Sequence, residues 1–183
     1  MTWSFGSVKV STQSSTRPSS CSLRPTAKET ILLNSDLLEF LDVLRDTEVR
    51  FLIVGGYAVM KYTEPRATKD IDLWIDTAPE NAERVYQALA RFGAPLAGYT
   101  PQDFTDPNTF FQIGVRFRVD LITSMPAGLI FPDAWERRVV GHLHGKAVPF
   151  ISIEDLITAK RATGRPQDLL DLQNLLNVLG RQA

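Results

Sequence analysis

The sequence predicts an α+β fold in which a mixed β-sheet carries helices mainly on one face and is followed by a C-terminal helical pair. Apolar runs of strand length, at 51–54 and 70–75, alternate with segments in which apolar residues recur at helical spacing. Two leucine-containing helical periods then follow one another over 152–179 without an intervening strand. This order of elements is typical of a sheet covered by helices.

Composition limits the class of protein before any motif is considered. With 183 residues, of which 44% are hydrophobic and 22% charged, the chain suits one soluble globular domain. The net charge of −1 gives no overall basic field that would attract nucleic acid. The single cysteine, Cys21, excludes an intrachain disulfide, and no apolar run reaches the roughly 18–20 residues of a membrane span. We therefore expect a cytoplasmic protein that does not engage a membrane.

Residues 1–27 differ in composition from residues 28–183, which we expect to form the single domain. The first segment is rich in Ser and Thr, contains no Asp or Glu and lacks helical periodicity. A disordered tail or an over-called start site explains this composition best. An organellar targeting peptide has a similar bias and remains a minority interpretation, because no amphipathic arginine stripe is present.

Local signals define the individual elements. In chain order we predict a helix from 35, a strand over 50–54, a short helix over 57–62, a strand over 70–75, a helix from 77 to about 92, a loop or short turn over 93–106, strands over 109–114 and 116–123, a hairpin over 137–150, and helices over 152–163 and 166–179. Ser35 and Ser152 are placed to cap helices, and Thr77 with Glu80 forms a capping-box pattern. Gly164 is placed to end the penultimate helix.

Gly55 and Gly56 follow a buried strand and precede a helix. Glycines at such a turn let backbone N–H groups approach a phosphate, and the N-terminus of the helix favours an anion. The pair is neither a Walker loop, because no Gly-Lys-Ser/Thr follows, nor a dinucleotide fingerprint, because the third glycine is missing. A turn that needs glycine only for its geometry is the alternative interpretation.

Asp70 and Asp72 lie two residues apart in a predicted strand, so their side chains project from the same face. At strand spacing the two Cα atoms lie roughly 6–7 Å apart, and two such charges repel by about 2–3 kcal/mol at an effective dielectric near 20. Bound Mg²⁺ would remove that cost, since it takes carboxylate oxygens and shares its shell with substrate phosphates. A solvated acidic edge strand is the alternative.

Asp120 is flanked by apolar residues in another predicted strand, so it faces away from the core together with Arg116 and Arg118. A surface Arg–Asp pair explains this arrangement without any function. If the strand instead neighbours Asp70 and Asp72, three carboxylates can hold two Mg²⁺ ions or share one.

Phe51–Ala58 followed by Arg66–Leu73 resembles the signature of the DNA polymerase β-like nucleotidyltransferase superfamily. The small prokaryotic branch, which includes toxins of some type IV toxin–antitoxin systems, is the most similar. Thirteen residues separate Gly56 from Asp70, at the long end of the familiar spacing. The resemblance covers about residues 35–180 and implies a nucleotidyltransferase-like sheet.

The resemblance also implies a reaction and roles for the matching residues. An NMP would move from an NTP to a hydroxyl group with the help of Mg²⁺ or Mn²⁺. Gly55 and Gly56 would contact the triphosphate, and Asp70 and Asp72 would bind the metal. Asp120 would join them as a metal ligand and help to deprotonate the acceptor hydroxyl.

A second group of candidates lies near the C-terminus. Lys160 is placed to meet phosphate charge, and Asp168 and Asp171 share one helical face. Relatives often carry Lys immediately before the first of these acids, where this chain has Gln167. The alternative is an ordinary helix surface on which Arg165 pairs with one of the two acids.

Other residues have weaker support. Arg66 and Thr68 would touch phosphate by resemblance, with a loop brace as the alternative. His142 and His144 alternate in a predicted hairpin without a third metal ligand, which favours a polar face. Four aromatic residues are candidates for a base-stacking wall, with core packing as the simpler interpretation: Trp74, Tyr99, Phe104 and Trp135.

The acceptor is left open by the sequence: it is a tRNA end, a protein hydroxyl or a small molecule such as an aminoglycoside. The net charge disfavours a large RNA footprint, although a local basic groove around 116–118 and 137–138 would offset it. A cognate antitoxin is a further expected partner if the chain is a toxin. The rival function is a catalytically inactive module of the same fold that binds a nucleotide or a protein partner.

Overall fold

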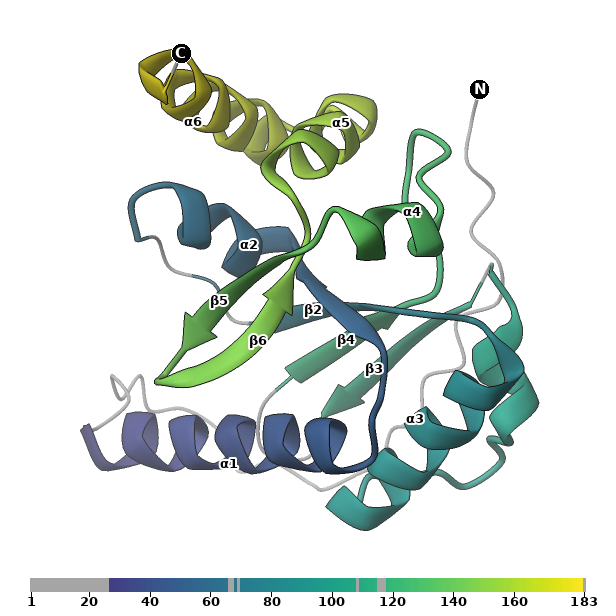
Figure 1. The fold of residues 1–183 in the computed structure, drawn as a ribbon. Coiled ribbons are helices and arrows are strands. Elements are labelled where there is room, and N and C mark those ends of the chain that lie inside the picture. Colours follow the sequence, from purple (N-terminus) through teal and green to yellow (C-terminus); the bar gives the residue numbers. More distant parts are fainter. Residues whose placement is uncertain (1–26, 66–67, 69, 108, 115–117, 183) are drawn as a thin grey trace, which may run out of the picture.

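The computed structural model describes residues 27–182 except 66, 67, 69, 108 and 115–117. Six strands form one mixed sheet in the order β3-β4-β2-β1-β6-β5 (Figure 1). Their bounds are β1 Phe51–Val54, β2 Asp70–Ile75, β3 Phe110–Gly114, β4 Arg118–Ile122, β5 Val139–Leu143 and β6 Lys146–Phe150. β2 pairs antiparallel with β1 and parallel with β4, β6 pairs parallel with β1, and the β3–β4 and β5–β6 pairs are antiparallel.

The predicted α+β class with a mixed sheet is confirmed, but helices lie on both sides of the sheet and not mainly on one face as expected (Figure 1). Their bounds are α1 Ala27–Asp46, α2 Gly55–Tyr62, α3 Pro79–Phe92, the 3₁₀ helix η1 Pro101–Thr105, α4 Phe131–Glu136, α5 Ile153–Thr163 and α6 Pro166–Gln182. The C-terminal pair α5–α6 was expected from the sequence. Among the described residues, no helix is both long and apolar enough to cross a membrane.

The two faces of the sheet differ in chemistry. α1 and α3 lie against one face, while α2, α4 and the α5–α6 pair lie on the other side (Figure 1). Ile53, Leu73 and Leu121 share a face in the strand register and are fully buried, and the rings of Phe40 and Phe92 join α1 to α3 at 4.9 Å. The alternate residues of the strands face the opposite way, where the buried apolar side chains of Leu52, Val54 and Trp74 lie on the same face as Asp72.

Several local predictions agree with the structure. Ser152 Oγ accepts a hydrogen bond of 3.1 Å from the Asp155 N–H, which is the predicted cap of α5. Gly164 ends that helix with φ of 62°. The β5–β6 hairpin turns at His144 and Gly145, both of which have positive φ.

Other boundaries differ from the prediction. α1 begins at Ala27, so Ser35 lies inside the helix, because the apolar spacing continues through Ile31 and Leu33. Ala78 occupies the cap position of α3, and its N–H donates to Asp76 Oδ1 at 3.2 Å, so the expected Thr77 capping box is absent.

Two short helices were not predicted at all. η1 lies in the segment expected to be a loop or short turn, and α4 has only six residues, too few to show a helical period. Of the predicted tail, residues 1–26 lie outside the described part of the chain, as does Arg66.

Candidate active site

Three aspartates meet on one face of the sheet, at the centre of the strand order. β2 and β4 are hydrogen-bonded neighbours, with Asp72 directly across from Asp120 and Asp70 across from Arg118. The expected pairing of these strands is therefore present. Because side chains alternate along a strand, all four of these residues project from one face.

The glycine turn lies against Asp72. β1 ends at Val54, which is paired with Asp72, and Gly55 follows with φ of +59°. A Cβ atom on Gly55 would lie 1.9 Å from Asp72 Oδ2, so no other residue fits without displacing the carboxylate. The Gly56 N–H, at the start of α2, donates a hydrogen bond to the same carboxylate. The glycines thus bring a helix N-terminus to the acids.

Burial and repulsion act together on Asp72. Burial is the main cause that raises its pKa to about 6, and the negative charge of Asp120 adds to it. The Gly56 hydrogen bond and the positive charge of Lys160 act in the opposite direction without cancelling the rise. Asp70 contributes a smaller repulsion. The site therefore contains more negative charge than the chain itself compensates.

Asp120 is buried and has two donors beside it. Gln112 Nε2 on β3 donates to Asp120 Oδ1 at 3.1 Å, and Arg118 Nε lies 3.7 Å from the same oxygen. Arg118 also forms an ion pair with Asp70. Burial raises the pKa of Asp120, and these two donors only partly oppose it. Sequence reasoning missed Gln112, although it is the one polar side chain of β3 and faces the acidic side.

The side chains of Asp70, Asp72 and Asp120 are of the type that binds a hard divalent cation. Each offers carboxylate oxygens, the ligands that Mg²⁺ and Mn²⁺ prefer. The raised pKa of Asp72 reflects negative charge that a bound cation would neutralise. Within the described residues, no three Asp, Glu, His or Cys side chains are arranged as metal ligands. Arg118 contacts Oδ2 of Asp70, so this oxygen can join a shared metal only if that ion pair opens.

Lys160 connects the two C-terminal helices. Its Nζ donates to Asp168 Oδ1 at 2.6 Å and to Asp171 Oδ2 at 2.9 Å, and all three side chains are buried. Burial would raise the pKa of Asp168, but hydrogen bonds from Lys160, Arg165 and Thr163 outweigh it and hold the pKa at about 2. These contacts favour a structural role for the cluster.

The neighbours of this cluster support the same interpretation. Arg165 Nε donates to Asp168 Oδ2 at 2.8 Å, which is the pairing considered as the alternative. Gln167, which stands where relatives often have Lys, donates to Asp171 Oδ1 at 3.1 Å. Lys160 still lies within electrostatic reach of Asp72, so its predicted role toward nucleotide remains a prediction.

Thr68 and the two histidines are the remaining polar candidates. Thr68 Oγ1 donates to the Asp70 carbonyl at 3.3 Å, which agrees with a loop brace. His142 and His144 are exposed on the β5–β6 hairpin, as expected for a polar face.

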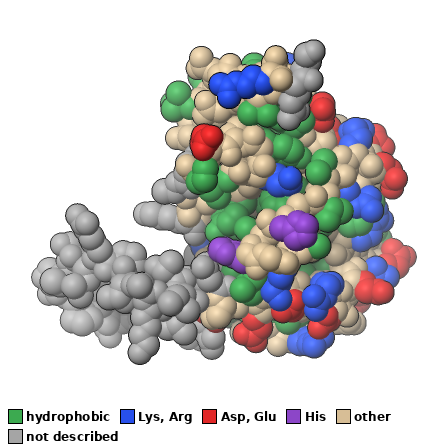
Figure 2. All heavy atoms as spheres, turned by 60° about the vertical axis from the view of Figure 1, so that its left-hand side comes forward, with side chains coloured by type: hydrophobic (Ala, Val, Ile, Leu, Met, Phe, Trp, Pro, Cys, Tyr) green, Lys and Arg blue, Asp and Glu red, His purple; other side chains and the backbone are tan. Residues whose placement is uncertain are grey.

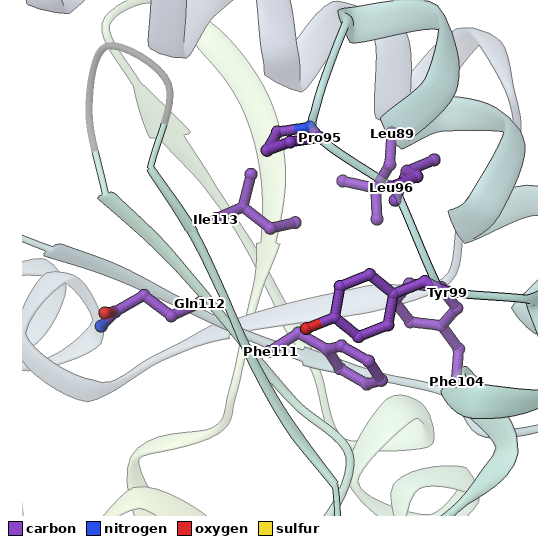
Figure 3. A pocket seen from close by; sticks show the side chains of 8 residues that line it. All are labelled: Leu89, Pro95, Leu96, Tyr99, Phe104, Phe111, Gln112 and Ile113. Atoms are coloured by element: carbon purple, nitrogen blue, oxygen red, sulfur yellow. The ribbon is translucent and has the colours of Figure 1, made fainter. Parts of the chain in front are cut away.

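The aromatic candidates serve mainly in packing. Trp74 and Phe104 are fully buried. Tyr99, Phe104 and Phe111 line a cavity of about 30 Å³, which has room for only a few water molecules (Figure 3). Gln112 points away from the other lining side chains toward the acids (Figure 3), so the cavity lies on the opposite side of β3 from them.

Trp135 on α4 lies between two arginines. The guanidinium carbons of Arg50 and Arg138 lie 4.9 and 4.2 Å from its ring, and Phe131 stacks on it at 5.7 Å. In the structure, the Trp135 ring therefore packs against side chains of the chain itself.

Comparisons with known structures agree on the fold. The lincosamide antibiotic adenylyltransferase LnuA, solved with lincomycin bound, is 18% identical over 79% of this chain and 96% of its own, with a TM-score of 0.54. The antibiotic-resistance factor ANT(2'')-Ia is 18% identical over 84% and 87%, with a TM-score of 0.56. A putative nucleotidyltransferase from Thermotoga maritima is 18% identical over 82% and 94%, with a TM-score of 0.52.

Comparison by sequence gives the family. No curated protein sequence matches the chain. Residues 33–179, which contain the glycine turn and all three aspartates, match a family of nucleotidyltransferases of unknown function. The chain therefore belongs to the nucleotidyltransferase family DUF6036, as the motif around the aspartates predicted.

Proposed function

We propose that the protein transfers an NMP from an NTP to a hydroxyl group in a reaction that depends on Mg²⁺ or Mn²⁺. The observation that carries this proposal is the position of Asp72, directly across from Asp120 and in contact with the Gly55–Gly56 turn. A carboxylate pair beside a helix N-terminus provides cation ligands and an anion site at one place.

Each residue then has a defined task. Asp70 and Asp72 would hold the divalent cation, which when bound would neutralise charge at the phosphates and lower the pKa of the attacking hydroxyl. Asp120, whose pKa is raised, accepts the proton from that hydroxyl. The acceptor oxygen bonds to the α-phosphorus, the bond from that phosphorus to the β-phosphate oxygen breaks, and pyrophosphate leaves. N–H groups at the start of α2 contact the triphosphate.

We favour a small hydroxylated molecule as the acceptor. LnuA was solved with lincomycin bound and ANT(2'')-Ia with adenylyl-2''-tobramycin, and both are similar to this chain over most of their length. Arg116, one of the four basic residues proposed for an RNA groove, lies outside the described residues. The other three are engaged within the chain: Arg118 pairs with Asp70, Arg137 pairs with Asp155 at 3.0 Å, and Arg138 packs on Trp135. On the face shown in Figure 2, basic and acidic side chains are intermixed, which gives no broad basic track there.

Labelled nucleotide tests the proposal directly. The purified protein is incubated with each α-³²P-labelled NTP, Mg²⁺ or Mn²⁺ and a cell extract, and label is then measured separately in the small-molecule, tRNA and protein fractions. We expect label in the small-molecule fraction. Label in tRNA or protein would identify a different acceptor and would make the toxin function, with a cognate antitoxin, the next hypothesis to test.

Two variants make the result specific. Asp72→Asn keeps the size of the side chain but removes its charge, and it should abolish transfer. Glu83→Gln, on α3 at the opposite face of the sheet, is the matched control and should transfer normally. Calorimetric binding of NTP without transfer to any fraction would support the inactive nucleotide-binding module instead.

A further inference from the structure

The guanidinium of Arg118 lies between two of the three carboxylates. It forms an ion pair with Asp70, and its Nε lies 3.7 Å from Asp120 Oδ1. β4 places Arg118 directly across from Asp70 and two residues before Asp120, so all three side chains share one face. A protein cation therefore engages Asp70, which is proposed to bind the metal, and Asp120, which is proposed to accept the proton.

The guanidinium and a metal compete for the same oxygens. Three carboxylates and one guanidinium leave a formal charge of −2 at the site, which matches the charge of one divalent cation. A carboxylate oxygen that coordinates Mg²⁺ at about 2.0–2.1 Å cannot keep a close contact with a guanidinium at the same lone pair. Asp70 Oδ2, the oxygen that Arg118 contacts, has to exchange one partner for the other if it is to coordinate the cation.

Arg118 is the partner that is free to move. Its side chain is 48% exposed, whereas that of Asp120 is 10% exposed and that of Asp70 is 23% exposed. Arginine keeps its charge at every physiological pH, so a released guanidinium remains a cation above the acidic face. Its planar fork of donors matches phosphate oxygens, which would arrive at this face with the nucleotide.

We propose that Arg118 is a positioning residue that exchanges partners during loading: it holds Asp70 and Asp120 before the cation binds and then contacts the substrate phosphates. This inference rests on the proposed function, because it needs both a cation and a polyphosphate at this face. It gives Arg118 opposite effects on the two ligands, which a purely structural residue would not have.

Binding measurements on the full chain test the exchange. Mn²⁺ alone is titrated and followed by electron paramagnetic resonance, and inorganic tripolyphosphate is then titrated by calorimetry at saturating Mn²⁺. In Arg118→Ala, Mn²⁺ should bind about fivefold more tightly, because the competing ion pair is gone. Tripolyphosphate should bind about tenfold more weakly, because charged hydrogen bonds to it are lost. Arg118→Lys keeps the charge but not the fork, so it should lose tripolyphosphate affinity with little change toward Mn²⁺.

Controls separate this inference from the proposed function. Arg45 also lies between two aspartates, Asp42 at 3.1 Å and Asp46 at 2.9 Å, but on α1 at the other face, so Arg45→Ala should change neither affinity. If Mn²⁺ binding is lost in Asp72→Asn but does not tighten in Arg118→Ala, or if tripolyphosphate binding is unchanged there, the exchange is wrong and the metal site stands. If the wild type binds no Mn²⁺, both proposals fail.

Discussion

Replacing Asp72 with Asn should make the protein more stable while removing its proposed activity. The pKa of Asp72 is raised from 3.8 to about 6, mainly by burial and then by the charge of Asp120. At 1.36 kcal/mol per pKa unit, the ionised carboxylate costs the fold about 3 kcal/mol. Solvent screens part of this cost because the side chain is not fully buried, so we expect about 2 kcal/mol. Asn has the same shape and can still accept the Gly56 hydrogen bond.

The effect has a defined dependence on pH. Because the pKa is raised in the folded state, the folded protein binds the proton of Asp72 more tightly than the unfolded chain does. The stabilisation that comes from this tighter proton binding is fully present below pH 3.8 and is lost as the pH rises through about 6. Asn does not titrate, so the variant and the wild type should have the same free energy of unfolding near pH 3.8. Above about pH 6, the variant should be more stable than the wild type by the full amount.

Urea denaturation from about pH 4 to about pH 8 measures this difference directly. Glu83→Gln serves as the control, since it removes an exposed acid from α3 and should show no such trend. If the difference between Asp72→Asn and wild type is the same at every pH, or if the wild type is more stable at about pH 8, then the burial and repulsion inferred for Asp72 are wrong.

Three further substitutions test the surroundings of the site by urea denaturation. Gly55→Ala should cost more than about 2 kcal/mol, because its φ is positive and the new Cβ would strike Asp72, whereas Gly98→Ala, with φ of +85° and open space, should cost only about 1 kcal/mol. Lys160→Met should cost about 3–5 kcal/mol, because it removes the cation that two buried carboxylates on α6 share, although Asp168 keeps its pairing with Arg165; a loss below about 1 kcal/mol would contradict the structural role. Ser152→Ala should cost about 1 kcal/mol through loss of the α5 cap, and an unchanged midpoint would argue against that hydrogen bond.

The strands of the site were predictable because their signals are local. Alternation places Asp70 and Asp72 on one face, and apolar flanks place Asp120 opposite the core. That β2 and β4 are neighbours is a non-local fact, and only the family resemblance suggested it. Gln112 was missed for the same reason, because its importance depends on which residue lies across from it in the sheet.

The features that the sequence did not show share a physical origin. Charged side chains usually face water, so the sequence did not show that α5 and α6 bury the Lys160–Asp168 ion pair between them. Thr77 has the pattern of a helix cap, but Asp76 accepts the hydrogen bond one residue earlier. α4 is shorter than two helical turns and has no period to detect.

The acidic residues and the glycine turn all come from strands that have a neighbour on both sides, β4, β2 and β1, while β3 and β5 form the outer edges. Amides in such interior strands exchange with deuterium only when most of the molecule opens, whereas edge strands fray at little cost. Heating or mild denaturant should therefore open the edge strands β3 and β5 first and leave the three aspartates in place. Catalytic competence should then disappear in one cooperative step together with the interior of the sheet.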